Sequence, residues 1–571
     1  MTATDTYLLL RAFCDELARC GMTHACTSPG SRNTPLLLSL VREPRIRSFS
    51  HIDERCAGFF ALGAAKASGR PVAVTCTSGT AVANLAPAVI EAFQARVPLI
   101  VLSADRPPEL REVGAGQTID QVKLFGAAVK WFFEVGTHAA PPDRVRWMRQ
   151  LACRAYWTAL SAPAGPVHLN FPLREPLVLH EPLPQDPAPG RPGGRPWVSR
   201  DPAPDRSAGS IQSTGGRTVV VAGAGAPAGL AELAAAAGVP LLADPLSGAR
   251  RGPAAIAHYD LLLRDPGFAA AHAPEVVIRV GVLPTSKPLR QWLANLPLAE
   301  QIAVEPDGSW HDPDAVVSRR LPALALPPGP GGGWLFGWRT ADEDAAAAIA
   351  AAVGDQLSEP LVAAKLSEWL PPGASLFVAS SMPIRDVEEF TAASERAPQV
   401  LSNRGANGID GTVSAAFGAA AASQGPVVLL IGDVALAHDV GGLMAARRLE
   451  VPLTIVLLHN DGGGIFHFLP VAGQADAFET HVATPHGLDF ARAAALYGCG
   501  YERPQDVAGL QAALTRSLAG RGTTIIEVRT AREQNLELHR RVAEAVRRSL
   551  AESAGEAGGL SPRRPATAPG A

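Results

Sequence analysis

Cysteine is scarce in this sequence. The 571-residue chain has seven cysteines, and no two of them form a C-x-x-C pair. An odd number of scattered cysteines argues against a disulfide framework and against a structural zinc site. The cysteine pattern therefore predicts a protein of the reducing cytoplasm.

Long apolar runs and an excess of positive charge are also missing. No uninterrupted apolar stretch is long enough to cross a bilayer. Charged residues interrupt the apolar ones over positions 1–21, which is typical of an amphipathic helix rather than a signal peptide. The chain has 51 Lys and Arg against 54 Asp and Glu, so no basic field favours nucleic acid. We expect a soluble protein whose partners are small molecules, neither membrane nor nucleic acid.

The length requires several domains, since a domain averages about 150 residues. Short apolar segments alternate with helical stretches, which predicts parallel, doubly wound sheets. We predict an α/β protein with three such domains at 1–181, 217–354 and 355–554. A linker rich in Pro and Gly is expected at 182–216, and a disordered tail at 555–571.

Apolar runs that are typical of strands occur in every predicted domain. They cover residues 72–76, 99–102, 167–171, 217–222, 276–280, 301–304, 426–431 and 452–458. A V-P-L sequence enters a run in both the first and the third domain, which suggests that these two domains share a fold.

The second domain opens with part of a nucleotide-binding motif. Gly223-Ala224-Gly225 resembles half of a dinucleotide fingerprint, but Pro227 and Ala228 follow where the third glycine belongs. A tight strand-to-helix turn is therefore favoured over a bound dinucleotide.

Two polar residues of the third domain lie just beyond predicted strands. Asp433 comes after the run 426–431, and Asn460 after the run 452–458. Open α/β sheets bind ligands at the carboxyl ends of their strands. With the main-chain carbonyl of Gly462, these side chains form an oxygen ligand set that suits Mg²⁺. A lone Gly-Asp also marks ordinary turns, but the pair of segments resembles the metal and diphosphate site of thiamine diphosphate enzymes.

Glu54 is the candidate for the acid that activates such a cofactor. Thiamine chemistry needs a carboxylic acid hydrogen-bonded to the aminopyrimidine ring, and burial keeps a carboxyl protonated. Glu54 precedes a segment of small residues, 58–66, that is predicted to be helical. The helix dipole alone also favours an acidic residue at a helix N-terminus, so both interpretations fit the spacing.

Motifs in all three domains resemble one family of thiamine diphosphate enzymes, the 2-succinyl-5-enolpyruvyl-6-hydroxy-3-cyclohexene-1-carboxylate synthases of menaquinone biosynthesis (MenD family). The motifs are T-S-P-G-S-R-N-T-P (27–35), S-A-D-R-P (103–107), G-Q-T-I-D-Q (116–121), P-T-S-K (284–287), S-N-R-G-A-N-G-I-D-G (402–411) and G-G-G-I-F (462–466). The resemblance implies decarboxylation of 2-oxoglutarate and 1,4-addition of the succinyl carbanion equivalent to isochorismate. It also implies Mg²⁺ or Mn²⁺, and a homodimer or homotetramer with active sites between subunits.

The resemblance also implies roles for individual residues. Guanidinium groups bind planar carboxylates in a bidentate way, although most arginines are simply exposed. Arg32, Arg106, Gln117 and Lys287 are expected to hold isochorismate, and Ser381, Arg385 and Arg404 the succinyl carboxylate. Other expected contacts are Ser31, Ile465 and Phe466 with substrate, Thr80, Ile409, Gly432 and Ile465 with cofactor, and Asp433, Asn460 and Gly462 with metal. Glu54, Arg385 and Arg404 are the expected catalytic residues, and Ile409 the wedge that bends the cofactor, although core packing explains Ile409 nearly as well.

Two other functions fit parts of this pattern. A different thiamine diphosphate carboligase, or a 2-oxoacid decarboxylase, would share Glu54, Asp433 and Asn460 but would not need Arg32, Arg106 and Lys287 together. A non-catalytic binding protein of the same fold would need no proton relay at Glu54.

Overall fold

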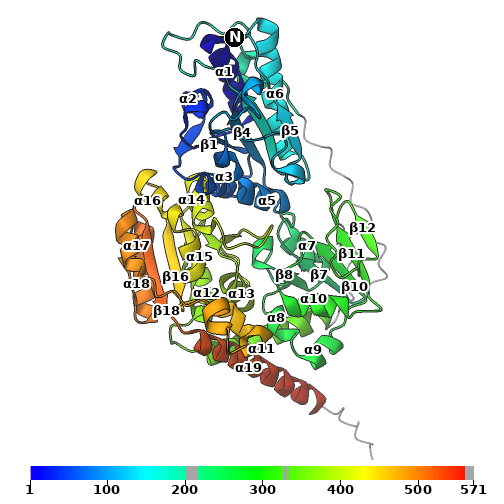
Figure 1. Ribbon diagram of the computed structural model, residues 1–571. Helices are drawn as coiled ribbons and strands as arrows, with labels where there is room; N and C mark the ends of the chain where they lie inside the picture. The colour runs from blue at the N-terminus through cyan, green and yellow to red at the C-terminus, as the bar shows by residue number, and fades with distance from the viewer. Residues whose placement is uncertain are drawn as a thin grey trace, which may run out of the picture.

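The protein is built from three parallel sheets. The computed structural model describes residues 2–200, 216–324, 326, 329, 331 and 333–559. In these residues each sheet has six strands, every strand pairs in parallel, and helices are interleaved with the strands (Figure 1). This confirms the predicted α/β fold with three doubly wound domains. None of the described helices has the length and apolar character needed to cross a membrane.

The first domain has the strand order β2-β1-β3-β4-β6-β5. Its elements are α1 (Ala3–Cys20), β1 (His24–Thr27), α2 (Thr34–Val41), β2 (Arg47–Ser50), α3 (Glu54–Ser68), β3 (Val72–Cys76), α4 (Thr80–Ala83), α5 (Ala86–Gln94), β4 (Leu99–Asp105), β5 (Trp131–Glu134), α6 (Pro142–Leu160) and β6 (Val167–Pro172). Strands β3, β4 and β6 are buried along their whole length, as expected of central strands covered on both faces. α1 begins at a capping box between Thr2 and Asp5.

The third domain repeats this arrangement, with the order β14-β13-β15-β16-β18-β17. Its elements are α12 (Glu359–Trp369), β13 (Ser375–Val378), α13 (Met382–Phe390), β14 (Gln399–Leu401), α14 (Thr412–Ala422), β15 (Val427–Gly432), α15 (Asp433–His438), α16 (Met444–Arg448), β16 (Thr454–His459), α17 (Phe490–Tyr497), β17 (Gly500–Glu502), α18 (Val507–Ala519), β18 (Thr524–Arg529) and α19 (Arg532–Gly559). Counted within each domain, both orders are the same. The suggestion that the two domains share a fold is confirmed.

Helices α3 and α14 join the first domain to the third through close backbone contact (Figure 1). A Cβ on Gly63 would lie 1.8 Å from the carbonyl oxygen of Ala415, and a Cβ on Gly418 would lie 1.9 Å from that of Phe60. Only glycine permits this approach. One hydrophobic cluster consequently runs through both domains and includes Phe60 and Phe417.

The second domain has a different strand order, β12-β11-β10-β7-β8-β9. Its elements are β7 (Thr218–Ala222), α7 (Leu230–Ala237), β8 (Leu241–Ala243), β9 (Ala255–Ile256), α8 (Tyr259–Leu262), α9 (Pro266–Ala271), β10 (Val276–Val280), α10 (Lys287–Ala294), β11 (Glu300–Val304), β12 (Arg319–Leu321) and α11 (Trp334–Val353). Read from the β9 edge, this is the order of dinucleotide-binding sheets. The Gly223 turn is nevertheless filled by protein, because a Cβ there would lie 1.7 Å from the carbonyl oxygen of Val282. Packing between two loops thus accounts for Gly223, and a φ of +84° accounts for Gly225.

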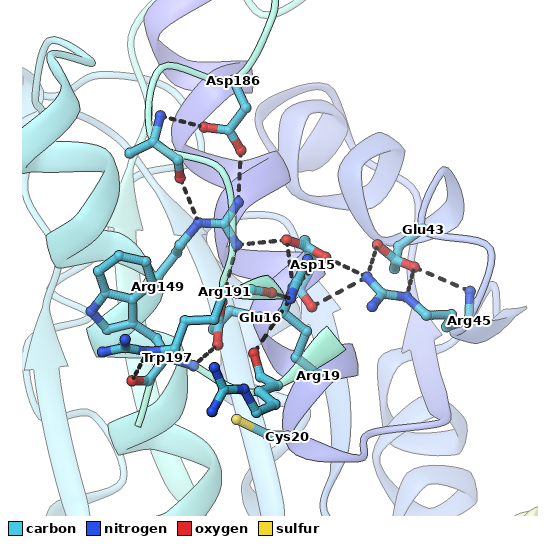
Figure 2. Close-up of polar contacts among 12 residues, drawn as sticks. Asp15, Glu16, Arg19, Cys20, Glu43, Arg45, Arg149, Asp186, Arg191 and Trp197 are labelled. Atoms are coloured by element: carbon cyan, nitrogen blue, oxygen red, sulfur yellow. Dashed lines mark hydrogen bonds and ion pairs between the residues drawn. The ribbon is translucent and has the colours of Figure 1, made fainter. Parts of the chain in front are cut away.

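Two segments outside the sheets differ from the sequence-based expectation. Residues 182–200, expected as a linker, lie against the first domain, where Arg149 donates to Asp186 and the backbone N–H of Trp197 to Glu16 (Figure 2). α19 runs to Gly559, past the expected start of the tail at 555, and its apolar side chains join the core of the second domain. Residues 201–215 and 560–571, which belong to the expected linker and tail, lie outside the described residues.

Candidate active site

The predicted site residues of the first domain lie at the carboxyl ends of its strands. Ser31 follows β1, Glu54 follows β2, Thr80 follows β3 and Arg106 follows β4. Parallel strands end at the same edge of a sheet, so residues distant in the sequence share one edge. The topology therefore gathers these four residues without any of them being adjacent in the chain.

Glu54 is the first residue of α3 and is half-buried. Asp53 caps the helix, accepting a hydrogen bond from the backbone N–H of Arg55 at 2.8 Å. The Arg55 guanidinium also pairs with Asp53, at 2.7 Å, so that positive charge is engaged by the neighbouring carboxylate. Burial raises the pKa of Glu54 above its usual value. This environment suits a carboxyl group that has to keep its proton.

Arg32 and Arg106 form a cationic pair at the same edge. Arg32 is buried and donates to the carbonyl oxygen of Leu173 at 2.7 Å and to Glu175 at 3.2 Å. Arg106 donates to the carbonyl oxygen of Gly116 at 3.1 Å. Burial, and then the charge of Arg106, lower the pKa of Arg32. Because the charges of the two guanidinium groups repel each other, an anion bound between them would be stabilised.

Gln117 is held in place by the turn that precedes Thr80. Its Nε2 donates to the carbonyl oxygen of Ser78 at 3.1 Å, and the Ser78 hydroxyl donates to the Gln117 carbonyl at 2.9 Å. Gln117 has a φ of 57°, a backbone conformation that residues other than glycine rarely adopt. Its carboxamide nitrogen is thus engaged within the protein, and its oxygen is the group left to meet a ligand.

One cavity of the third domain collects most of the residues predicted there. Its lining includes Ser381, Ile409, Gly432, Asp433, Asn460, Gly462, Ile465 and Phe466. Asp433 and Asn460 directly follow β15 and β16, two neighbouring strands. Glu54 does not line this cavity, and neither does Lys287, an exposed residue at the start of α10 in the second domain.

The oxygen atoms in this cavity fit a divalent cation. Asp433 Oδ2 accepts hydrogen bonds from the backbone N–H groups of Asn460, at 3.1 Å, and Gly462, at 3.2 Å. The Oδ1 atom of Asn460 is buried and has no hydrogen-bond partner among the described residues. A buried acceptor normally has a partner, and a cation would supply one. The Gly462 carbonyl already accepts from the Gly464 N–H at 3.0 Å, and its second lone pair stays available.

Both the surroundings and the backbone conformation of Gly462 require a glycine at this position. It has a φ of +143°, and a Cβ would lie 2.4 Å from the carbonyl oxygen of Ala483. The backbone of this loop is therefore folded tightly beside Asp433. The glycines of the G-G-G-I-F motif serve loop geometry, which sequence alone does not distinguish from ligand contact.

Two histidines that were not predicted as site residues face Asp433. His459 Nε2 lies 3.8 Å and His486 Nε2 lies 3.4 Å from Asp433 Oδ2. His459 is oriented by Glu527, which lies 2.8 Å from Nδ1. With Asp433 these imidazoles form a group that could also hold a metal ion. His486 belongs to an irregular loop, and no pattern in the sequence signals its position.

Of the two arginines expected at the succinyl carboxylate, Arg385 lies in α13, the helix that follows β13, and Arg404 lies in the loop that follows β14. Arg385 Nη1 donates to the carbonyl oxygen of Ser381 at 2.6 Å, and Arg404 Nη1 donates to the Ser380 hydroxyl at 3.3 Å. Burial, and then the charge of Arg385, lower the pKa of Arg404. Ser380 and Ser381 both line the cavity that contains Asp433. This second cationic pair therefore borders the candidate metal site.

Comparisons with known proteins identify the family of each domain. Three family models match: "Thiamine pyrophosphate enzyme, N-terminal TPP binding domain" at residues 9–124, "Middle domain of thiamine pyrophosphate" at 195–378, and "Thiamine pyrophosphate enzyme, C-terminal TPP binding domain" at 386–528.

Relatives with the same printed name match over almost the whole chain. The 2-succinyl-5-enolpyruvyl-6-hydroxy-3-cyclohexene-1-carboxylate synthase of Chloroflexus aurantiacus is 43% identical, covering 95% of this chain and 96% of its own length. Those of Geobacillus kaustophilus, at 43% identity over 95% and 98%, and Halobacterium salinarum, at 42% over 96% and 99%, are similar to the same extent. The chain therefore belongs to the 2-succinyl-5-enolpyruvyl-6-hydroxy-3-cyclohexene-1-carboxylate synthase family of thiamine diphosphate-dependent enzymes.

Proposed function

We propose that this protein decarboxylates 2-oxoglutarate and adds the succinyl carbanion equivalent to isochorismate in a 1,4-addition, in the cytoplasm. The product is 2-succinyl-5-enolpyruvyl-6-hydroxy-3-cyclohexene-1-carboxylate. The observation that carries the proposal is the buried, unpartnered Asn460 Oδ1 beside Asp433, in a cavity bordered by a cationic pair.

The two ends of the cofactor need different groups from the protein. When bound, thiamine diphosphate supplies the nucleophilic carbon and the electron sink for decarboxylation. We assign its diphosphate, through Mg²⁺ or Mn²⁺, to Asp433, Asn460 and the Gly462 carbonyl. Glu54 donates the hydrogen bond to its pyrimidine ring. The raised pKa of Glu54 supports that role, because only the protonated carboxyl can donate.

The two cationic pairs suit the two dianionic substrates. Arg32 and Arg106, with Gln117, Ser31 and Lys287, are assigned to the carboxylates of isochorismate. Arg385 and Arg404, with Ser381, are assigned to the distal carboxylate of 2-oxoglutarate. Guanidinium groups hold carboxylates in a fixed plane, so each pair would orient its substrate towards the reacting carbon. Ile465 and Phe466 would exclude water from that carbon, while Ile409 would support the bent cofactor.

The complete site requires two chains. The cavity that contains Asp433 is not lined by Glu54 of the same chain, although one cofactor has to reach both groups. We therefore assign the Glu54 of each site to a second copy of the protein. The assembly is a homodimer, or a tetramer made of two such dimers.

The decisive experiment measures isochorismate consumption by the purified protein, with the product identified by mass. Consumption should require thiamine diphosphate, Mg²⁺ and 2-oxoglutarate together. If a 2-oxoacid is decarboxylated while isochorismate remains, the protein is a different thiamine diphosphate enzyme. If the cofactor does not bind at all, the protein is a non-catalytic member of the fold.

A further inference from the structure

A buried carboxylate lies directly behind the candidate metal site. Glu359, the first residue of α12, is 1% exposed and lines the same cavity as Asp433. Its Oε1 accepts from Asn460 Nδ2 at 2.8 Å and from the Thr530 hydroxyl at 2.9 Å, and its Oε2 accepts from Asn535 Nδ2 at 3.1 Å. Three donors thus converge on one side chain, two from the residues that directly follow β16 and β18 and one from α19.

The contact with Asn460 determines which end of its amide faces the cavity. A carboxamide has an oxygen that accepts and a nitrogen that donates, so a rotation of 180° about its last bond exchanges the two. Only the oxygen can bind a cation. Glu359 accepts from the nitrogen, and the oxygen is left as the unpartnered atom.

The amide is also confined by the glycine-rich loop. A Cβ on Gly464 would lie 2.8 Å from Asn460 Nδ2, so backbone lies close to the amide nitrogen. Reversing the amide would bring its oxygen against Glu359 Oε1, which already accepts from the Thr530 hydroxyl, and two acceptors repel each other. The native orientation is therefore the favourable one even before a cation binds.

We propose that Glu359 is a positioning residue for the metal, because its carboxylate orients the Asn460 amide so that Oδ1 faces the divalent cation. This inference rests on the proposed thiamine diphosphate site. Glu359 itself does not touch the cation, since its Oε1 is already engaged by Asn460 and Thr530. The role requires a hydrogen-bond acceptor and does not require a negative charge.

Two substitutions separate these requirements. Glu359→Gln keeps one oxygen for Asn460 and Thr530, and its new N–H₂ group can donate to Asn535 Oδ1, which is buried and unpartnered, once that amide rotates. Glu359→Leu fills a similar volume but accepts nothing. Removing such an orienting partner typically weakens metal binding by about 10- to 100-fold. We expect that loss for Glu359→Leu and an affinity close to the parent for Glu359→Gln.

Binding is measured without turnover, as the Mn²⁺ bound in the presence of thiamine diphosphate, by electron paramagnetic resonance of the free ion. Thr530→Val is the matched control, since it removes another donor to the same Oε1 and leaves the Asn460 bond in place. Its Mn²⁺ affinity should stay near that of the parent. Unfolding of the metal-free variants by circular dichroism checks that each is folded; if Glu359→Leu is not, Glu359→Met replaces it.

The most specific test combines Glu359→Leu with Asn460→Asp. A carboxylate presents oxygen in either orientation, so the second change should restore much of the Mn²⁺ binding lost in the first. Damage to packing would not be repaired in this way. If the parent binds Mn²⁺ and Glu359→Leu binds it equally well, or if Asn460→Asp restores nothing, the inference is wrong. If the parent protein itself binds no Mn²⁺ with thiamine diphosphate, the proposed function fails instead.

Discussion

Lys66 Nζ lies 3.3 Å from Glu91 Oε1, and this buried ion pair of the first domain holds a loop of the third. Lys66 donates to the carbonyl oxygen of Ser402 at 2.6 Å and to Asn403 Oδ1 at 3.0 Å. Burial lowers the pKa of Lys66, so its ammonium depends on these partners.

Lys66 and Glu91 together form a clamp on this loop, and Glu91 holds its other side. It accepts from the backbone N–H groups of Gly405, at 2.9 Å, and Ala406, at 2.6 Å. A Cβ on Gly405 would lie 2.6 Å from the carbonyl oxygen of Glu91, which accounts for the glycine. Arg404 stands between the two clamped segments, so contacts with the first domain fix its position.

Breaking this clamp should affect one substrate more than the other. Lys66→Met leaves Glu91 buried without its partner, a change that typically costs about 3–5 kcal/mol of stability. In the protein that remains folded, KM for 2-oxoglutarate should rise more than KM for isochorismate, because Arg404 loses its support. Steady-state kinetics with each substrate varied in turn measures the ratio. Adding Glu91→Gln should recover stability, since no charge is then left unpaired; equal changes in both KM values would contradict the assignment of Arg404.

Glu54→Gln should nearly abolish turnover while thiamine diphosphate still binds. Positioned acid–base groups contribute about 10²- to 10⁴-fold to rate, and Gln keeps the shape of the side chain without its acidic proton. Cofactor binding followed by circular dichroism, beside the rate of isochorismate consumption, separates the two effects. Asp53→Asn is the matched neighbour, because Asp53 caps α3 and pairs with Arg55. It should change the rate little, and a Glu54→Gln protein with unchanged turnover would refute the proton role.

The two cationic pairs should discriminate between the substrates. Hydrogen bonds to charged groups contribute about 1.5–3 kcal/mol, so Arg106→Gln should raise KM for isochorismate by roughly 10- to 100-fold and leave decarboxylation of 2-oxoglutarate largely intact. Carbon dioxide release, measured without isochorismate, tests the second half of this statement. Arg404→Gln should instead raise KM for 2-oxoglutarate and leave KM for isochorismate largely unchanged. If Arg106→Gln left isochorismate turnover untouched, the protein would be a different thiamine diphosphate carboligase.

His539 should make stability depend on alkaline pH. Burial alone would lower its pKa, but Asp386 and Glu389, at 3.1 and 3.4 Å, outweigh burial and raise the pKa from 6.5 to about 10. The folded state therefore binds this proton more tightly than the unfolded state. Protonated His539 makes its full contribution to the free energy of unfolding below pH 6.5. It is lost as the pH rises through about 10. Denaturant unfolding of the parent and of His539→Gln should show a large difference at pH 6 that shrinks towards pH 10; a constant difference would mean that His539 acts by packing alone, for example against Phe390.

Part of the carboxyl edge could be predicted from sequence, because Thr80, Arg106, Asp433 and Asn460 come shortly after predicted apolar runs, whereas the strands before Ser31 and Glu54 were not predicted. The predicted runs 72–76 and 276–280 coincide with β3 and β10, and the ends of β15 and β16 place Asp433 and Asn460 on neighbouring strands. Local sequence carries this information, since strand length and burial are local properties.

The supporting residues could not be predicted, because they act across long distances in the chain. Glu359 lies 101 positions from Asn460, and Lys66 lies 336 from Ser402. Nothing in a glutamate at a helix start distinguishes an amide-orienting group from an ordinary one. The return of α19 to the second domain was equally hidden, because its apolar face would fit any core.

The course of α19 has a consequence for how the protein is made. Asn535, near its start, contacts Glu359, while Leu538, Val542 and Val546 complete the core of the second domain. During synthesis the sheet of the first domain can form from its own residues, since its strands are all contributed by residues 24–172, although part of its core is shared with the third domain. The Asn535–Glu359 contact and the core of the second domain both depend on this one helix, so neither is complete before the segment from Asn535 to Val546 has been synthesised.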